Sequence, residues 1–119
     1  MTEIRLKRVY EAPDENDGYR ILVDRLWPRG IKKENLKLDY WDKDIAPSSE
    51  LRKWFHTDQA RNWDEFVVRY RKELNDSGAL SELVNNVKNH VTVTLLFGAK
   101  DTVHNQAVIL KEELEKRLG

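Results

Sequence analysis

Apolar and polar residues follow one another along the chain in patterns that predict three β-strands. Residues 4–9 alternate between apolar and charged side chains, which is typical of a half-buried strand at the edge of a sheet. Residues 19–26 contain a nearly continuous apolar run, as expected of a strand that is covered on both faces. Residues 91–97 are rich in β-branched side chains and predict a third strand.

Helical spacing of apolar residues predicts four helices. Ser48 is expected to cap a short helix that runs through Phe55. Apolar stripes over residues 63–74, before Gly78, and over residues 80–87 predict the next two helices. The stripe of the last helix consists of Val103, Ala107, Leu110, Leu114 and Leu118.

The order of these elements predicts the α/β class, with a small, mainly parallel sheet flanked by helices. Three helices separate the second and third strands, and a connection of that length fits a crossover between parallel strands rather than a hairpin. Residues 31–47 carry many charges and are expected to be irregular. At this length we expect one domain over residues 1–119.

Composition and charge narrow the classes of function. The 21 basic and 21 acidic side chains leave no net charge, which disfavours a general nucleic-acid or membrane binder but permits a local basic patch. The chain has no cysteine, so disulfides, thiolate zinc sites and cysteine nucleophiles are excluded. No apolar signal segment or membrane-spanning stretch is visible, and we expect a cytoplasmic protein without membrane association.

Candidate chemistry lies in two loops, residues 24–30 and 100–105, each of which follows a predicted strand. Ligands of parallel sheets bind outside the carboxyl ends of the strands, so the two loops are expected to face one crevice. Arginine side chains and the free amides of a helix start suit an anion. The predicted ligand-binding residues are Arg25, Trp27, Arg29, Gly30, Lys100, Asp101 and Asn105.

Asp24 and His104 are the candidates for catalytic roles. His104 is the residue best able to transfer a proton near neutral pH, and Asp24 would orient an arginine. Structural roles remain open for these side chains. Asp101 or Asn105 can cap the last helix, Asp24 can pair with a neighbouring arginine, and Arg29 can stack on Trp27. His104 can be an ordinary surface histidine.

Other familiar chemistries find no support in the sequence. There is no glycine-rich dinucleotide fingerprint, P-loop or nucleophile elbow. The histidines at positions 56, 90 and 104 lack metal-ligand spacing, and His56 fits a structural role at a helix end. We therefore expect neither a metal nor a cofactor.

The chain resembles the YeaO-like family, the short bacterial branch of the DUF-488 proteins. The resemblance covers almost the whole length, and the most specific motif is the block of residues 18–30 that ends in Leu-Trp-Pro-Arg-Gly. Further matching positions are Arg8-Val9-Tyr10, Trp41, Ala46-Pro47-Ser48, residues 51–55, Trp63, Phe66, Tyr70, Asp101 and residues 104–107. The resemblance implies Rossmann-like layering but no established activity. Longer relatives carry a Cys-His-Arg motif, and this chain lacks the cysteine.

Two hypotheses of function follow. The first is a site for an anion or a nucleotide-type small molecule, with or without catalysis. The second is a non-enzymatic regulatory module that touches nucleic acid through Arg52, Lys53 and the basic run at residues 69–72. Zero net charge and the absence of helix-turn-helix spacing weigh against the second hypothesis. We expect a monomer or a homodimer.

Overall fold

The computed structural model describes residues 2–119 and contains a four-stranded, fully parallel sheet. The strand order is β1-β4-β2-β3. This arrangement confirms the predicted α/β class and the position of the first strand at the sheet edge. The strands are β1 (Glu3–Arg8), β2 (Tyr19–Leu22), β3 (Tyr40–Trp41) and β4 (Thr92–Phe97).

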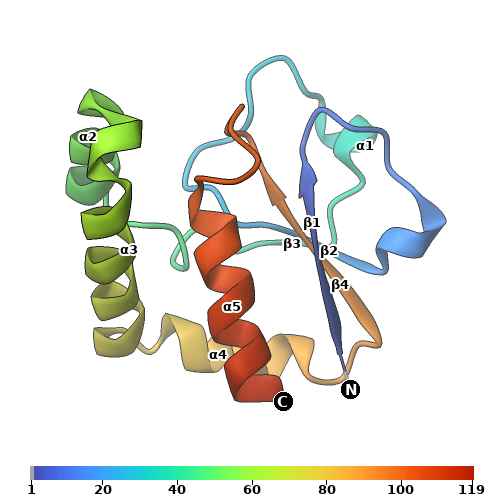
Figure 1. The fold of residues 1–119 in the computed structure, drawn as a ribbon. Helices are drawn as coiled ribbons and strands as arrows, with labels where there is room; N and C mark the ends of the chain where they lie inside the picture. The colour runs from blue at the N-terminus through green and yellow to red at the C-terminus, as the bar shows by residue number, and fades with distance from the viewer. Residues whose placement is uncertain (1) are drawn as a thin grey trace.

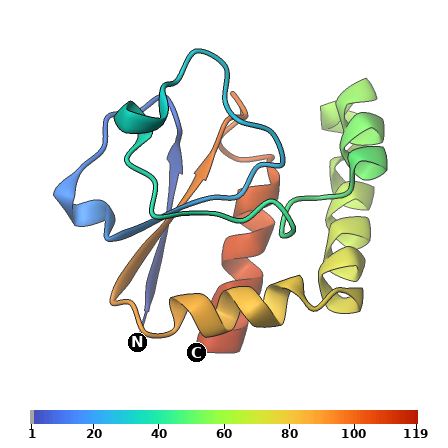
Figure 2. The same cartoon turned by 180° about the vertical axis from the view of Figure 1, so that it is seen from behind.

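Helices cover both faces of the sheet unequally (Figures 1 and 2). The larger layer holds the helices that follow β3, and the thinner layer holds α1 and a 3₁₀ turn. The helices are α1 (Lys33–Leu36), α2 (Ser49–Thr57), α3 (Gln59–Asp76), α4 (Ala79–Val87) and α5 (Gln106–Leu118), and the 3₁₀ turn is η1 (Glu15–Asp17). No helix within residues 2–119 combines the length and the apolar character needed to cross a bilayer.

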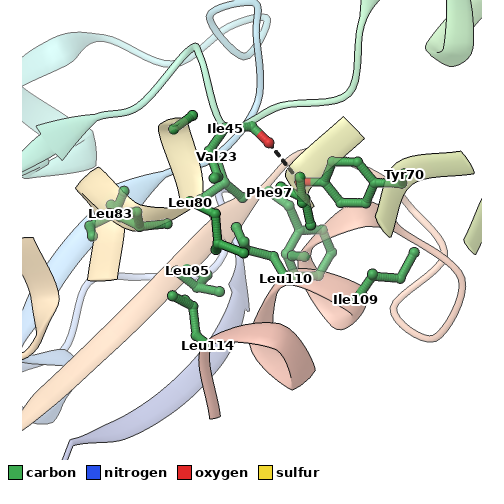
Figure 3. Packing of buried hydrophobic residues seen from close by; sticks show 14 of the residues in the cluster. Val23, Ile45, Tyr70, Leu80, Leu83, Leu95, Phe97, Ile109, Leu110 and Leu114 are labelled. Atoms are coloured by element: carbon green, nitrogen blue, oxygen red, sulfur yellow. Dashed lines mark hydrogen bonds between the residues drawn. The ribbon is translucent and has the colours of Figure 1, made fainter. Parts of the chain in front are cut away.

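The central strand β4 explains why the core is double-sided. Successive side chains of a strand point to opposite faces. Leu95 and Phe97 therefore join the main core with the larger helical layer, whereas Leu96 packs in a smaller cluster beneath α1. Figure 3 shows the main core and the buried hydroxyl of Tyr70, which donates to the carbonyl oxygen of Ile45 at 2.6 Å.

The prediction that the second and third strands are parallel members of one sheet is confirmed, and the two strands are also direct neighbours. Ile21 of β2 lies opposite Leu95 of β4 in parallel register. The loops that follow the two strands therefore leave the same edge of the sheet. This adjacency is the structural premise of a shared crevice.

Two sequence predictions about the second strand and the segment after it are corrected. β2 ends at Leu22 instead of Leu26, because the chain turns away at Asp24 after one further bond from the amide of Val23 to Leu96. Residues 31–47 are not wholly irregular, since they contain α1 and β3. The predicted N-cap of α2 is confirmed, since the side chain of Ser48 accepts from the amide of Leu51 at 3.1 Å.

The start of the last helix is also corrected. α5 begins at Gln106 with Asn105 as its N-cap, and Val103 is 62% exposed rather than part of the core stripe. The cause is a local turn in which the carboxylate of Asp101 accepts from the amides of Val103 and His104, both at 2.9 Å. The amides of Val103 and His104 therefore have their hydrogen-bond acceptor in this turn, before the first residue of α5. The rest of the predicted stripe faces the core, with Ala107, Leu110 and Leu114 buried and Leu118 partly buried.

Candidate functional site

A cleft of about 160 Å³ opens where the loops after β2 and β4 meet α2, α3 and the start of α5. Four of the predicted site residues line it: Asp24, Arg25, His104 and Asn105. The expectation that the two loops share one crevice therefore holds for these residues. The wall opposite the sheet comes from α2 and α3, which contribute Arg52, Phe55, His56, Gln59 and Phe66.

Asp24 ties the carboxyl ends of three strands together. One oxygen of its carboxylate accepts from the amide of Gly98 at 2.8 Å, and the other accepts from the side-chain amide of Gln106. Its carbonyl oxygen accepts from the indole of Trp41 at 2.7 Å. The carboxylate thus positions the loop after β4 and the first residue of α5.

The electrostatics of Asp24 follow from this enclosed position. Burial raises the pKa of the Asp24 carboxyl, while the hydrogen bonds from Gly98 and Gln106 and the charge of Arg52 oppose the rise. The contact also requires a small residue at position 98, because a Cβ on Gly98 would lie 3.0 Å from the Asp24 oxygen. The close approach of the Asp24 carboxylate therefore explains why a glycine follows β4 at position 98.

Two arginines approach the cleft with unused hydrogen-bonding capacity. Arg25 donates through Nη2 to the carbonyl oxygens of Ala46 and Pro47, both at 3.3 Å. The Nε atoms of Arg25 and Arg52 are buried and have no hydrogen-bond partner within residues 2–119. Because buried donors are normally satisfied, these two atoms call for an explanation.

The loop before α5 is organised by short-range bonds. Asn105 is fully buried, accepts from the amide of Val108 at 3.2 Å and donates to the carbonyl oxygen of Asp101 at 2.8 Å. Bonds from the amides of His104 and Val103 hold the pKa of the Asp101 carboxyl below its usual range. Nδ1 of His104 lies 3.1 Å from Asp101, and its ring meets Trp63 edge-on with centroids 5.0 Å apart.

The remaining predicted residues lie outside the cleft. Trp27 donates to the carbonyl oxygen of Ile31 at 2.6 Å and packs in the smaller cluster on the opposite face of the sheet. Arg29 is exposed, and Gly30 occupies a left-handed turn with φ of 77°. Lys100 and Asp101 belong to the loop after β4 but do not line the cleft.

Sequence reasoning missed several polar residues that the cleft contains. The sequence predicts nucleic-acid contact for Arg52 and a structural role at a helix end for His56, yet both line the cleft from α2. Burial and the charge of Arg52 lower the pKa of His56. Helical spacing carried a signal, since Arg52 and His56 are one turn apart and share a helix face.

Comparison with known proteins assigns the chain to a family. A family model described as the inactive DUF488-N3 subclade matches residues 3–119. The chain belongs to this DUF488 subclade. Within residues 2–119, no group of three or more histidine, aspartate or glutamate side chains is arranged to hold a metal ion.

The relatives of this DUF488 protein are themselves described as uncharacterised. The Escherichia coli protein YeaO is 46% identical over 111 residues, which cover 93% of this chain and 96% of YeaO. An uncharacterised protein of Mycobacterium tuberculosis is 43% identical over 116 residues, covering 98% of this chain and 97% of its own. No solved structure matches the chain.

Proposed function

We propose that this DUF488 protein binds a small anionic ligand in the cleft between α2 and the carboxyl ends of β2 and β4. The observation that carries the proposal is that Arg25 and Arg52 line the same cleft and that, within residues 2–119, neither forms an ion pair with a carboxylate. A carboxylate or phosphate group would pair with their guanidinium charges through charge-assisted hydrogen bonds. The position at the carboxyl ends of parallel strands is the usual place for ligands in this fold class.

Binding without turnover fits the site better than catalysis. Both oxygens of the Asp24 carboxylate already accept hydrogen bonds, so Asp24 acts as a positioning residue. The ring of His104 is engaged by Asp101 and Trp63 at the margin of the cleft. The description of the matching subclade as inactive agrees with this reading. Catalytic roles for Asp24 and His104 stay a prediction.

The nucleic-acid alternative receives less support. Arg69 is paired with Glu65 at 2.8 Å and lies over the ring of Trp54, and Arg71 is paired with Glu112 at 2.7 Å. Arg52 turns toward the cleft. Three of the arginines that would touch phosphates are therefore engaged by acidic partners or by the cleft, which leaves Lys53 and Lys72 as the exposed cations of this set.

Thermal unfolding with a panel of anions tests the proposal. Phosphate, sulfate, acetate and small organic acids are added to the wild type and to Arg52→Gln, with Arg29→Gln as the matched control outside the cleft. A ligand that binds only the folded state at about 100 times its Kd stabilises it by about 2.7 kcal/mol. At least one anion should raise the Tm of the wild type and Arg29→Gln by several degrees and should leave Arg52→Gln unchanged.

Arg52 is the better probe because its guanidinium forms no hydrogen bond within residues 2–119 whose loss would weaken the fold, whereas Arg25 bonds to backbone carbonyls. Arg25→Ala should also remove the stabilisation. If no anion in the panel stabilises a well-folded wild type, or if Arg52→Gln responds like the wild type, the proposed site is wrong.

A further inference from the structure

The size of the cleft limits what can be enclosed in it. Its volume of about 160 Å³ is close to that of an apolar protein cavity of about 150 Å³ that accommodates one benzene molecule. Pockets for larger ligands occupy about 300–1,000 Å³. The cleft can therefore enclose one ring or one branched alkyl group, but it is too small to enclose a complete nucleotide.

The lining of the cleft adds a requirement for an apolar body. The apolar part of the wall around the two arginines consists of Leu26, Ala46, Pro47, Phe55, Phe66 and Ala99. Phe55 and Phe66 are buried and stacked with ring centroids 4.2 Å apart, so this part of the wall is a packed aromatic pair. An inorganic phosphate would lose its hydration shell against these rings without gaining contacts in return, whereas an apolar group would gain them.

The charges around the cleft favour a single negative charge on the ligand. Arg25 and Arg52 supply two positive charges, and Asp24, whose carboxylate bonds to Gly98 and Gln106, supplies one negative charge. One unit of positive charge is left to be balanced. A monoanion balances it, while a dianion would leave an unpaired negative charge beside Asp24 in a partly desolvated site.

These observations rest on the proposed function and deepen it. We propose that the ligand is a small monocarboxylic acid with an aromatic or branched aliphatic body. Its carboxylate pairs with the guanidinium groups of Arg25 and Arg52, and its apolar body lies against Phe55, Phe66 and Leu26. Binding places the single charge of the ligand beside the two cationic side chains that line the cleft.

Calorimetric titration with matched probes tests the ligand class. Benzoate and isovalerate carry one charge and an apolar body, acetate lacks the body, and benzamide lacks the charge. Phosphate and adenosine monophosphate represent the dianionic and nucleotide alternatives. Benzoate or isovalerate should bind at least tenfold more tightly than acetate and benzamide.

Two variants separate the contribution of charge from that of the apolar wall. Arg52→Gln should weaken benzoate binding at least tenfold, because a charge-assisted hydrogen bond is lost. Leu26→Ala should weaken benzoate about fivefold while leaving acetate unchanged, since only apolar contact is lost. Leu26 is 62% exposed, so its truncation spares the core, and Val91→Ala, also at an exposed apolar residue but outside the cleft, is the matched control.

The possible failures are distinguishable. If phosphate or adenosine monophosphate binds through Arg52 and neither benzoate nor isovalerate binds, the proposed ligand class is wrong but the anion site is supported. Equal binding of benzamide and benzoate also overturns it, because the arginines would then be unused. A lack of binding by every anion overturns this inference and the proposed function together.

Discussion

Two aspartates on facing loops show how strongly local surroundings decide the behaviour of one chemical group. The carboxyl of Asp24 is enclosed in the cleft, and burial raises its pKa above the ordinary value of 3.8. The carboxyl of Asp101 is exposed, and hydrogen bonds from the amides of His104 and Val103 lower its pKa from the same value. The two residues should therefore respond to pH in opposite directions.

The pH dependence of unfolding tests this contrast. A carboxyl whose pKa is raised by folding adds most to stability at acidic pH and loses that contribution as pH rises through its folded pKa. Asp101, with a lowered pKa, contributes at neutral pH and loses its contribution as pH falls. In urea titrations from about pH 3.5 to 7, the stability advantage of the wild type over Asp24→Asn should shrink as pH rises. The advantage over Asp101→Asn should grow.

Both substitutions keep the shape of the side chain, so each variant serves as the control for the other. The side-chain amide of Gln106 can rotate to accept from an asparagine at position 24, which keeps the folded structure of Asp24→Asn comparable. Parallel pH profiles for the two variants would show that burial at Asp24 and amide bonding at Asp101 do not govern their titration.

Among the secondary-structure elements, the start of α5 joins the fold to the cleft. Asn105 caps the helix and also fastens the preceding loop, and it is 1% exposed. Asn105→Ala removes the side-chain bond to the amide of Val108, which keeps only its 3.3 Å bond to the backbone carbonyl of residue 105, and it removes the side-chain bond to the carbonyl oxygen of Asp101. Loss of a cap costs about 0.5–2 kcal/mol, and loss of a typical intramolecular hydrogen bond costs about 0.5–1.5 kcal/mol. We expect a loss of about 2–3 kcal/mol in the free energy of unfolding.

Asp58→Ala is the matched comparison for this cap. Asp58 caps α3 through one exposed bond from the amide of Arg61 at 3.2 Å, so its loss should cost about 1 kcal/mol or less. Chemical denaturation of both variants measures the difference. If the two substitutions cost the same, the bond from the Asn105 side chain to the carbonyl oxygen of Asp101 does not stabilise the loop.

The elements that could be predicted from the sequence are those with long apolar stripes or runs. Stripes in α3, α4 and α5 repeat over several turns, and the apolar run of β4 is long enough to mark a buried strand. β3 has two residues and α1 has four, too few for either periodicity to be visible. Tertiary contacts determine them instead, such as the bond from the indole of Trp41 to Asp24.

At the scale of the whole molecule, the cleft is assembled from segments that are far apart in sequence. Parallel pairing of β2 and β4 brings Arg25 and the loop of His104 to one edge, which the sequence pattern predicts. The packing of α2 against that edge adds Arg52 and His56, and no local pattern indicates where α2 lies relative to the sheet. The sequence also predicts Trp27, Arg29 and Gly30 at the cleft, but none of them lines it, and Trp27 packs on the other face of the sheet.

The thinner face of the sheet is held by a buried charge network. Asp17 accepts from Lys7 at 3.1 Å and from Arg20, and both Asp17 and Arg20 are 5% exposed. Arg20 donates to the carbonyl oxygen of Leu36 at 2.8 Å, and Thr94 donates to that of Asp17 at 2.7 Å. The network therefore joins β1, β2, β4 and α1, where the apolar cluster alone is small.

Replacing Asp17 should destabilise the whole molecule. Asp17→Asn removes the only carboxylate that faces Arg20 and Lys7 in this network, and breaking a buried ion pair costs about 3–5 kcal/mol because a charge is left uncompensated. Glu3→Gln removes an exposed pair with Arg5 and should cost less than about 1 kcal/mol. Urea denaturation at neutral pH measures both.

If Asp17→Asn fails to fold, Lys7→Met removes one partner and should still cost more than Glu3→Gln. Losses below about 1 kcal/mol for both network variants would show that the apolar cluster, and not the charge network, holds α1 against the sheet.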